Sequence, residues 1–146
     1  MFVEGMLRAA REKLVTIIGE ATLIDAAKLL CSGTDIVIVC DDKGVLQGVV
    51  TKTDVVKHIS VCQGATHTCP VSTVMTRDVA LCRETDLLKD VSKLMKEGHL
   101  KNIPVVNINC RPIGVLTARA VLRVLLSDSE YQEAQLSDYV MGVGYR

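Results

Sequence analysis

One short segment carries the residues best suited to bind a small polar molecule. Thr51 and Asp54 stand where the apolar run Gly48-Val-Val-Thr51 gives way to a helix-like stretch. A carboxylate at a helix start can accept both hydroxyls of a sugar such as ribose, and the free amides of the first helical turn can donate to phosphate. Thr and Asp also cap helices in proteins of every kind. A binding site and a plain helix cap are therefore both open interpretations of this segment.

Two histidines and two cysteines form a second candidate cluster, at His58, Cys62, His67 and Cys69. Imidazole and thiolate groups are ligands that zinc prefers. The three gaps between them hold three, four and one residues, which differs from the usual paired ligand spacing, and the small polar residues around them are typical of a connector. We expect no metal, with a zinc site as the alternative.

The sequence offers no motif for nucleophilic catalysis. It contains no G-x-S-x-G, no P-loop and no G-x-G-x-x-G string. A chain of 146 residues also leaves little room for a second substrate beside a site that binds one small polar molecule. We therefore expect that the protein is not an enzyme.

The composition indicates a small globular protein without a bias toward charged partners. Hydrophobic residues make up 49% of the chain and aromatic residues 3%, so the core must consist mainly of aliphatic side chains. Lys plus Arg and Asp plus Glu both total 17, which predicts neither nucleic-acid nor membrane binding. Without a signal segment or an apolar span we expect a cytoplasmic protein whose six cysteines are reduced.

The elements that must position Thr51 and Asp54 occur twice in the chain. Gly48-Val-Val-Thr51 matches Gly114-Val-Leu-Thr117 at an offset of 66 residues, and the apolar strand 36–41 matches 102–107 at the same offset. The helix-like segment 20–30 matches 84–94 at an offset of 64. An internal repeat of this length indicates one structural unit made twice.

Each copy reads as a β-α-β-β-α unit. Apolar residues at three- and four-residue spacing predict an amphipathic helix in each copy, capped by Thr22 or Asp86 and stopped by Gly33 or Gly98. Turn residues between the next two strands predict an antiparallel hairpin. One such unit buries too little surface alone, so we expect a mixed α/β (α+β) fold in which two units pack through their sheets about a pseudo-twofold axis.

The repeats also predict the domain boundaries. We expect a lead-in helix over residues 1–13, the first repeat over 14–60, a linker over 61–70, the second repeat over 71–126 and a polar tail over 127–146.

The doubled unit, the phrase Val71-Ser-Thr-Val-Met-Thr-Arg-Asp-Val79 and the G-h-h-T-x-x-D string from Gly48 to Asp54 (h is an apolar residue) resemble tandem CBS domains. The likeness covers roughly residues 12–126. It implies a Bateman module that binds AMP, ADP, ATP, NAD or, as an alternative, S-adenosylmethionine. A pair of this length also resembles small stand-alone bacterial CBS proteins that form homodimers.

The resemblance implies a set of ligand-binding residues. Asp54 would hold the ribose hydroxyls and Thr51 the ribose or phosphate, while the second copy has Ala120 in place of the aspartate. Adenine would be read by backbone groups of the first and second strands of a repeat, and His99 and the basic Lys101 and Arg119 would meet phosphates. The further positions are Val15, Thr16, Ile17, Ile36, Val37 and Ile38 for the first site, and Val79, Leu81, Asn102, Ile103, Pro104 and Thr117 for the second.

Three functions follow from these patterns. The first is a regulatory sensor that binds an adenine nucleotide between the repeats and controls a conformation or a dimer, and thereby an unknown partner protein. The second is a scaffold that dimerises without a ligand. Apolar residues after each Thr-x-x string serve either function, among them Val56, Ile59, Leu122 and Leu126. The third, metal binding, rests only on the His and Cys cluster.

Overall fold

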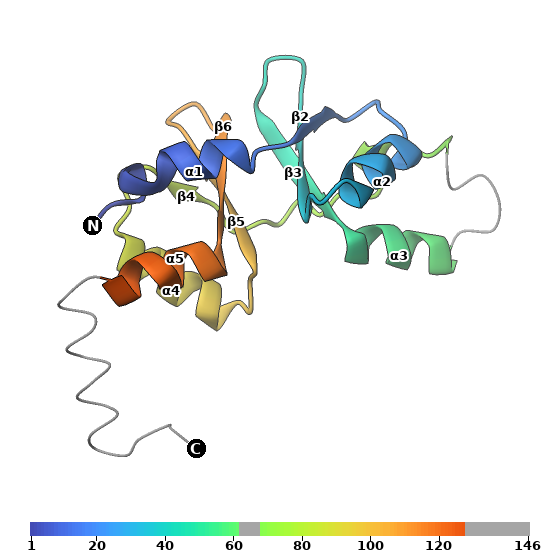
Figure 1. Cartoon of the computed structure of the whole chain (residues 1–146). Helices are drawn as coiled ribbons and strands as arrows, with labels where there is room; N and C mark the ends of the chain where they lie inside the picture. The colour runs from blue at the N-terminus through green and yellow to red at the C-terminus, as the bar shows by residue number, and fades with distance from the viewer. Residues whose placement is uncertain (62–67, 128–146) are drawn as a thin grey trace, which may run out of the picture.

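The chain builds two three-stranded sheets of the same design in the computed structural model (Figure 1), which describes residues 1–61 and 68–127. The first sheet contains β1 (Thr16–Ile18), β2 (Ile36–Cys40) and β3 (Leu46–Thr51). The second contains β4 (Cys82–Arg83), β5 (Asn102–Val106) and β6 (Pro112–Thr117). In each sheet the middle strand pairs in parallel with the first and antiparallel with the third. The predicted hairpins and the doubled mixed α and β fold are confirmed.

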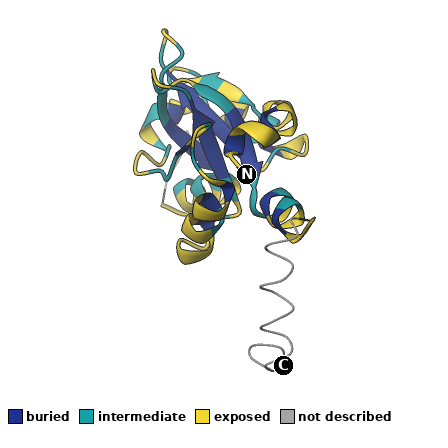
Figure 2. Ribbon diagram, turned by 90° about the vertical axis from the view of Figure 1, so that its left-hand side faces the viewer, coloured by how far each residue is buried: buried dark blue, intermediate teal, exposed yellow. Residues whose placement is uncertain are grey.

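Two helices accompany each sheet. They are α2 (Leu23–Cys31) and α3 (Lys52–Val61) in the first repeat, and α4 (Leu88–Glu97) and α5 (Ala118–Ser127) in the second. Buried residues concentrate in the strands, whereas the helices turn exposed faces outward (Figure 2). This arrangement follows from the strand β2, whose five residues are all apolar and all buried, because a sheet of that kind needs cover on both faces.

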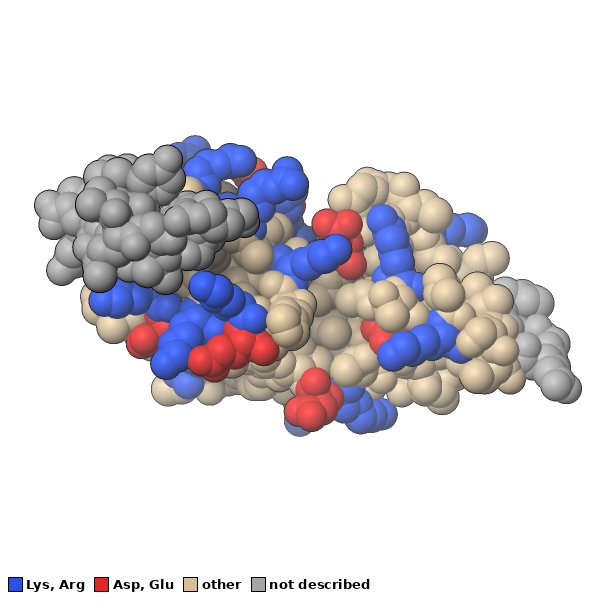
Figure 3. Space-filling model, turned by 90° about the horizontal axis from the view of Figure 1, so that it is seen from below, with Lys and Arg blue, Asp and Glu red and all other residues tan. Residues whose placement is uncertain are grey.

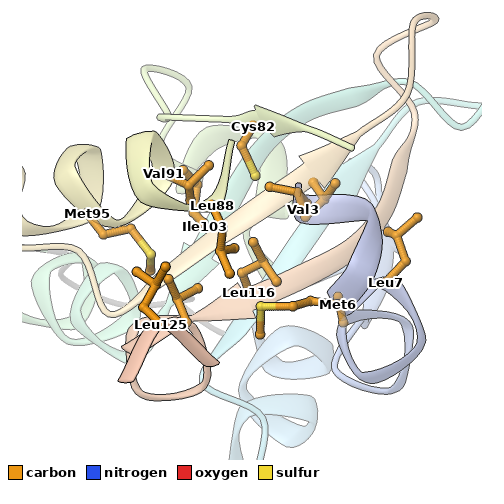
Figure 4. Packing of buried hydrophobic residues seen from close by; sticks show 13 residues of the cluster. Val3, Met6, Leu7, Cys82, Leu88, Val91, Met95, Ile103, Leu116 and Leu125 are labelled. Atoms are coloured by element: carbon orange, nitrogen blue, oxygen red, sulfur yellow. The ribbon is translucent and has the colours of Figure 1, made fainter. Parts of the chain in front are cut away.

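The start of the chain packs on the second repeat, although it precedes the first in sequence. A 3-10 turn, η1 (Val3–Met6), leads into α1 (Leu7–Glu12), and Val3, Met6 and Leu7 join Leu88, Ile103 and Leu116 in one core (Figure 4). The amide of Val3 donates to Asp86 O at 2.9 Å. The lead-in segment therefore ties the two ends of the described chain together.

A separate apolar cluster joins the two repeats. It consists of Ile36, Ile38, Cys40 and Val49 from the first sheet with Val115 from the second. The two hairpin turns also meet, since Leu46 N donates to Cys110 O at 2.9 Å and Arg111 Nε donates to Lys43 O at 3.0 Å. The repeats thus pack through their sheets, as the sequence predicts.

The helix ends agree with the sequence at one cap and differ at another. Thr22 caps α2 as predicted, in a capping box with Asp25. The prediction for Asp86 is wrong, because Leu87 precedes α4 and the Asp86 carboxylate accepts from Arg83 N at 2.8 Å instead. After α2 the left-handed residue is Gly33, but after α4 it is His99 (φ 52°) and not Gly98.

Some expectations fall on residues outside the described ranges. These are the central part of the linker, residues 62–67 with Cys62 and His67, and the polar tail from 128 to 146. A short 3-10 turn, η3 (Val71–Thr73), opens the second repeat. Within residues 1–61 and 68–127 no helix is both long and apolar enough to cross a membrane.

Candidate functional site

Asp54 lies in the first turn of α3, where Thr51 precedes the helix. Its Oδ2 accepts from Thr51 N at 2.9 Å and from the Thr51 hydroxyl at 3.1 Å, while Asp54 N donates to Thr51 Oγ1 at 3.4 Å. These reciprocal contacts make a capping box. The cap interpretation of this segment is therefore correct, but it engages mainly one carboxylate oxygen.

The other carboxylate oxygen faces the second repeat. Asp54 Oδ1 accepts from the Thr76 hydroxyl at 2.8 Å, although the two residues are 22 positions apart. Thr76 is held there by β3, because Thr76 N donates to Val49 O at 2.8 Å and Val49 N donates to Thr76 O at 2.9 Å. Gly48 permits this approach, since a Cβ at that position would lie 2.6 Å from Thr76 O. The glycine of the G-h-h-T string thus has a packing role.

A cleft of about 560 Å³ opens beside this contact, between the repeats. One wall comes from the starts of β2 and α3 in the first repeat, and the other from the segments before β4 and β5 in the second. Its lining residues are Asp35, Ile36, Val49, Thr51, Lys52, Thr53, Asp54, Thr76, Asp78, Val79, Ala80, His99, Leu100, Lys101 and Asn102.

Three kinds of group meet in this cleft. Ile36, Val49, Val79 and Leu100 offer apolar surface that suits a flat ring. Asp54 offers an acceptor for hydroxyl groups, and the ammonium groups of Lys52 and Lys101 offer charge for an anion. Charged side chains of both signs surround the hollow between the two halves (Figure 3). Such a set fits a ligand that joins a ring, a diol and an anionic group.

One of the two lysines at the cleft, Lys52, lies close to a carboxylate. Lys52 Nζ lies 3.9 Å from Asp35 Oδ1, with both side chains well exposed. A pair of this kind in water contributes little stability and costs little to separate. Lys52 can therefore turn from Asp35 to a bound anion.

The structure brings part of the predicted set together. Thr51, Asp54, Ile36, Lys101 and Asn102 all line the cleft, as do His99 and Val79. Their combination differs from the one that the resemblance implies, because Asp54 of the first repeat shares the cleft with the segments before β4 and β5 of the second. The opening strand of the second repeat also begins later than expected, at Cys82, which leaves Val79 in the segment before the strand.

Four predicted strand positions lie inside the core. Val37, Ile38 and Ile103 have no exposed surface, and Pro104 is also buried. Because β2 and β5 are the middle strands of their sheets, their backbones pair with a neighbour on each side. A base can meet such strands only where they begin, which is why Ile36 and Asn102 reach the cleft and these four residues do not.

Val15 and Leu81 are half-buried and, like the remaining predicted positions, do not line the cleft. Thr16 is exposed and Ile17 half-buried on β1, at the edge of the first sheet, and neither lines the cleft. Thr117 Oγ1 accepts from Ala120 N at 3.1 Å, so it caps α5. Arg119 is exposed in the first turn of α5 and also lies outside the cleft lining. Of the four candidate zinc ligands, His58 and Cys69 lie within the described residues.

The sequence reasoning missed Thr76 and Asp78 as lining residues. Both belong to the phrase 71–79, which carries part of the family likeness, and this was the available signal. Their position in the cleft depends on a contact between the repeats, which no local sequence pattern predicts.

Comparisons with known protein families match the description CBS domain to two segments of the chain, residues 6–61 and 71–127. Among curated proteins, homoserine O-acetyltransferase of Methanosphaera stadtmanae is 35% identical over 99 residues, which are 66% of this chain and 19% of that enzyme. The chain therefore spans about a fifth of the length of this relative.

Solved structures agree in both fold and extent. The CBS-domain protein ATU1752 from Agrobacterium tumefaciens has a TM-score of 0.72 at 28% identity, over 85% of this chain and 98% of that one. CBSX2, a CBS-pair protein from Arabidopsis thaliana, has a TM-score of 0.71 at 28% identity in its complex with AMP, over 86% of this chain and 96% of that one.

Proposed function

Since the chain belongs to the CBS-domain family as a tandem pair, we propose that it is a regulatory module that binds an adenine nucleotide in the cleft between its repeats. It performs no chemistry itself. A nucleotide that contacts both walls favours the arrangement in which the repeats are held together, and so shifts the population of conformations that a partner protein meets.

The placement of Asp54 carries this proposal. Its Oδ2 is engaged by the helix cap, while its Oδ1 lies at the cleft beside the Thr76 hydroxyl. A carboxylate oxygen has a second acceptor position, which suits a ribose hydroxyl. Lys101 and His99 on the opposite wall suit phosphate, and the similarity to CBSX2, whose structure contains AMP, supports the same ligand class.

The test is a comparison of two aspartates with the same cap role. Asp25 completes the capping box of α2 as Asp54 completes that of α3, but Asp25 lies outside the cleft lining. Each Asp→Ala change should cost about 1 kcal/mol of unfolding free energy through the lost cap. AMP at a hundred times its dissociation constant should stabilise the parent by about 2.7 kcal/mol. We expect Asp25→Ala to keep this stabilisation and Asp54→Ala to lose most of it.

Two results of that measurement would contradict the proposal. Equal stabilisation of Asp54→Ala and the parent by AMP would remove Asp54 from the site. If AMP, ADP, ATP and NAD at millimolar concentration all leave the parent unchanged, the scaffold function takes its place. Selective stabilisation by S-adenosylmethionine would identify that ligand instead, and a competition between AMP and ATP would indicate a sensor of energy state.

We also propose that the module is a homodimer formed through the helices that follow β3 and β6. Val56 and Ile59 on α3 are 64% and 57% exposed, and Leu122 and Leu126 on α5 are 45% and 41% exposed. Apolar stripes of this kind mark contact surfaces. Ile59→Glu and Leu122→Glu should each shift the species in sedimentation toward 15.9 kDa. The control Ile108→Glu, at an exposed turn, should not; a parent that sediments at 15.9 kDa would refute the dimer.

A cytoplasmic location is part of the proposal. It is supported by Cys40 and Cys82, which are both buried and free. Buried free cysteines suit a reducing compartment. Fractionation of cells that produce the protein tests this, and recovery in the membrane or secreted fraction would refute it.

A further inference from the structure

The two repeats differ at the hydrogen bond that joins Asp54 of the first repeat to Thr76 of the second. At the cleft, Gly48 of β3 faces Thr76, whose hydroxyl donates to Asp54 Oδ1 at 2.8 Å. Thr76 forms an antiparallel bridge with Val49, and the segment after it supplies Asp78 and Val79 to the cleft lining.

The matching place in the second repeat holds two alanines. Gly114 of β6 corresponds to Gly48, and a Cβ on Gly114 would lie 2.8 Å from the Cβ of Ala10. Ala10 thus occupies the place of Thr76. Ala120 stands where Asp54 stands in the first repeat, three residues after the threonine that caps the helix. Donor and acceptor of the bridging hydrogen bond are therefore both replaced by methyl groups.

The backbone at this place differs as well. Ala10 lies in the helix α1, whereas Thr76 forms an isolated antiparallel bridge with Val49 of β3. Ala10 is 2% exposed and belongs to the core of the second repeat, so this wall is filled by packing. Neither a carboxylate for ribose hydroxyls nor a hydroxyl that would orient it is present at this position.

We infer that the chain binds one nucleotide and not two, and that Thr76 is the positioning residue that orients Asp54 for it. This inference rests on the proposed function. Thr76 holds Asp54 Oδ1 at 2.8 Å from the segment that opens the second repeat, so the orientation of the ribose acceptor depends on the contact between the repeats. The pseudo-twofold symmetry of the fold is thereby broken at the ligand site.

The experiment is titration calorimetry of the full chain with AMP. We expect one AMP per chain in the parent, and none in Asp54→Ala. Thr76→Val should keep the stoichiometry but weaken binding about tenfold, because it removes one hydrogen bond to a charged group. Thr76→Ser should restore binding to about that of the parent, since a hydroxyl is all that the role requires. Arg119→Ala, at the second copy of the string, should change neither affinity nor stoichiometry.

The outcomes separate this inference from the function on which it rests. Two AMP per chain, or one AMP retained in Asp54→Ala, would overturn the single site while leaving a nucleotide-binding module. If Thr76→Ser bound as weakly as Thr76→Val, or if Thr76→Val bound as well as the parent, the positioning role would be refuted. A parent that binds no adenine nucleotide would overturn both the inference and the proposed function. Thr76 is exposed, so these variants should fold.

Discussion

Replacing Gly48 by alanine should loosen the contact between the repeats and weaken the ligand site together. The added Cβ would lie 2.6 Å from Thr76 O and 2.9 Å from Met75 Sδ, where ordinary van der Waals contact begins at about 3.4 Å. Because Thr76 O is a backbone atom, the segment itself must retreat by several tenths of an ångström. The paired hydrogen bonds between Val49 and Thr76 would lengthen or break.

The magnitude follows from opposing contributions. Two backbone hydrogen bonds contribute roughly 0.5 to 1.5 kcal/mol each, and overpacking of a tight site costs about 1 to 3 kcal/mol. Removing glycine from the unfolded chain returns about 0.4 to 1 kcal/mol. From the middle of these ranges, we expect Gly48→Ala to lower the unfolding free energy by about 3 kcal/mol in urea titration. Since Thr76 moves with its segment, AMP affinity should fall as well.

Gly114→Ala is the matched control for this prediction. Its Cβ would meet Ala10 at 2.8 Å, so it should displace α1 and cost a similar unfolding free energy. It does not touch Thr76, and AMP affinity should stay that of the parent. The reasoning would be refuted if Gly48→Ala matched the parent in both stability and affinity, or if both glycine variants lost the same affinity.

The remaining predictions concern a buried thiol and a strained helix end. Burial, with a smaller contribution from the Asp86 carboxylate, raises the pKa of the Cys82 thiol to about 12. In the unfolded chain the thiol has its ordinary pKa of 9.0, so the stability from this group is fully present below pH 9 and is lost as pH rises toward 12. In urea titrations from pH 8 to 11, the unfolding free energy of Cys82→Ala should therefore fall less than that of the parent, and an equal fall in both would contradict this. His99 has a φ of 52°, which costs a non-glycine residue roughly 1 kcal/mol. His99→Gly should therefore raise the melting temperature but weaken AMP binding, because the imidazole lines the cleft. His99→Ala should weaken AMP binding without raising the melting temperature. A lower melting temperature of His99→Gly would contradict the strain argument.

The sequence by itself determines the repeat unit and most of its local structure. The offset of 66 residues predicts two copies, and turn residues predict the hairpins that β2–β3 and β5–β6 form. Thr22 and Thr51 predict helix starts, because each caps a helix through hydrogen bonds to a residue three positions further on. Such features follow from sequence because their partners are neighbours in the chain. Asp54 also stands out in this way, as the carboxylate three residues after Thr51 in the first copy of the repeated string.

The tertiary structure alone decides what faces Asp54. The resemblance assigns Thr16 and Ile38 to its site, but Ile38 is buried where the two sheets pack, and the opposite wall comes from the second repeat. Thr76 reaches Asp54 only because Gly48 lets the two backbones approach closely. Ala10 takes the matching place beside Gly114 because α1, although it stands at the start of the sequence, packs on the second repeat. Contacts of this kind depend on how two apolar sheets bury one another, and no pattern within a single repeat specifies that packing.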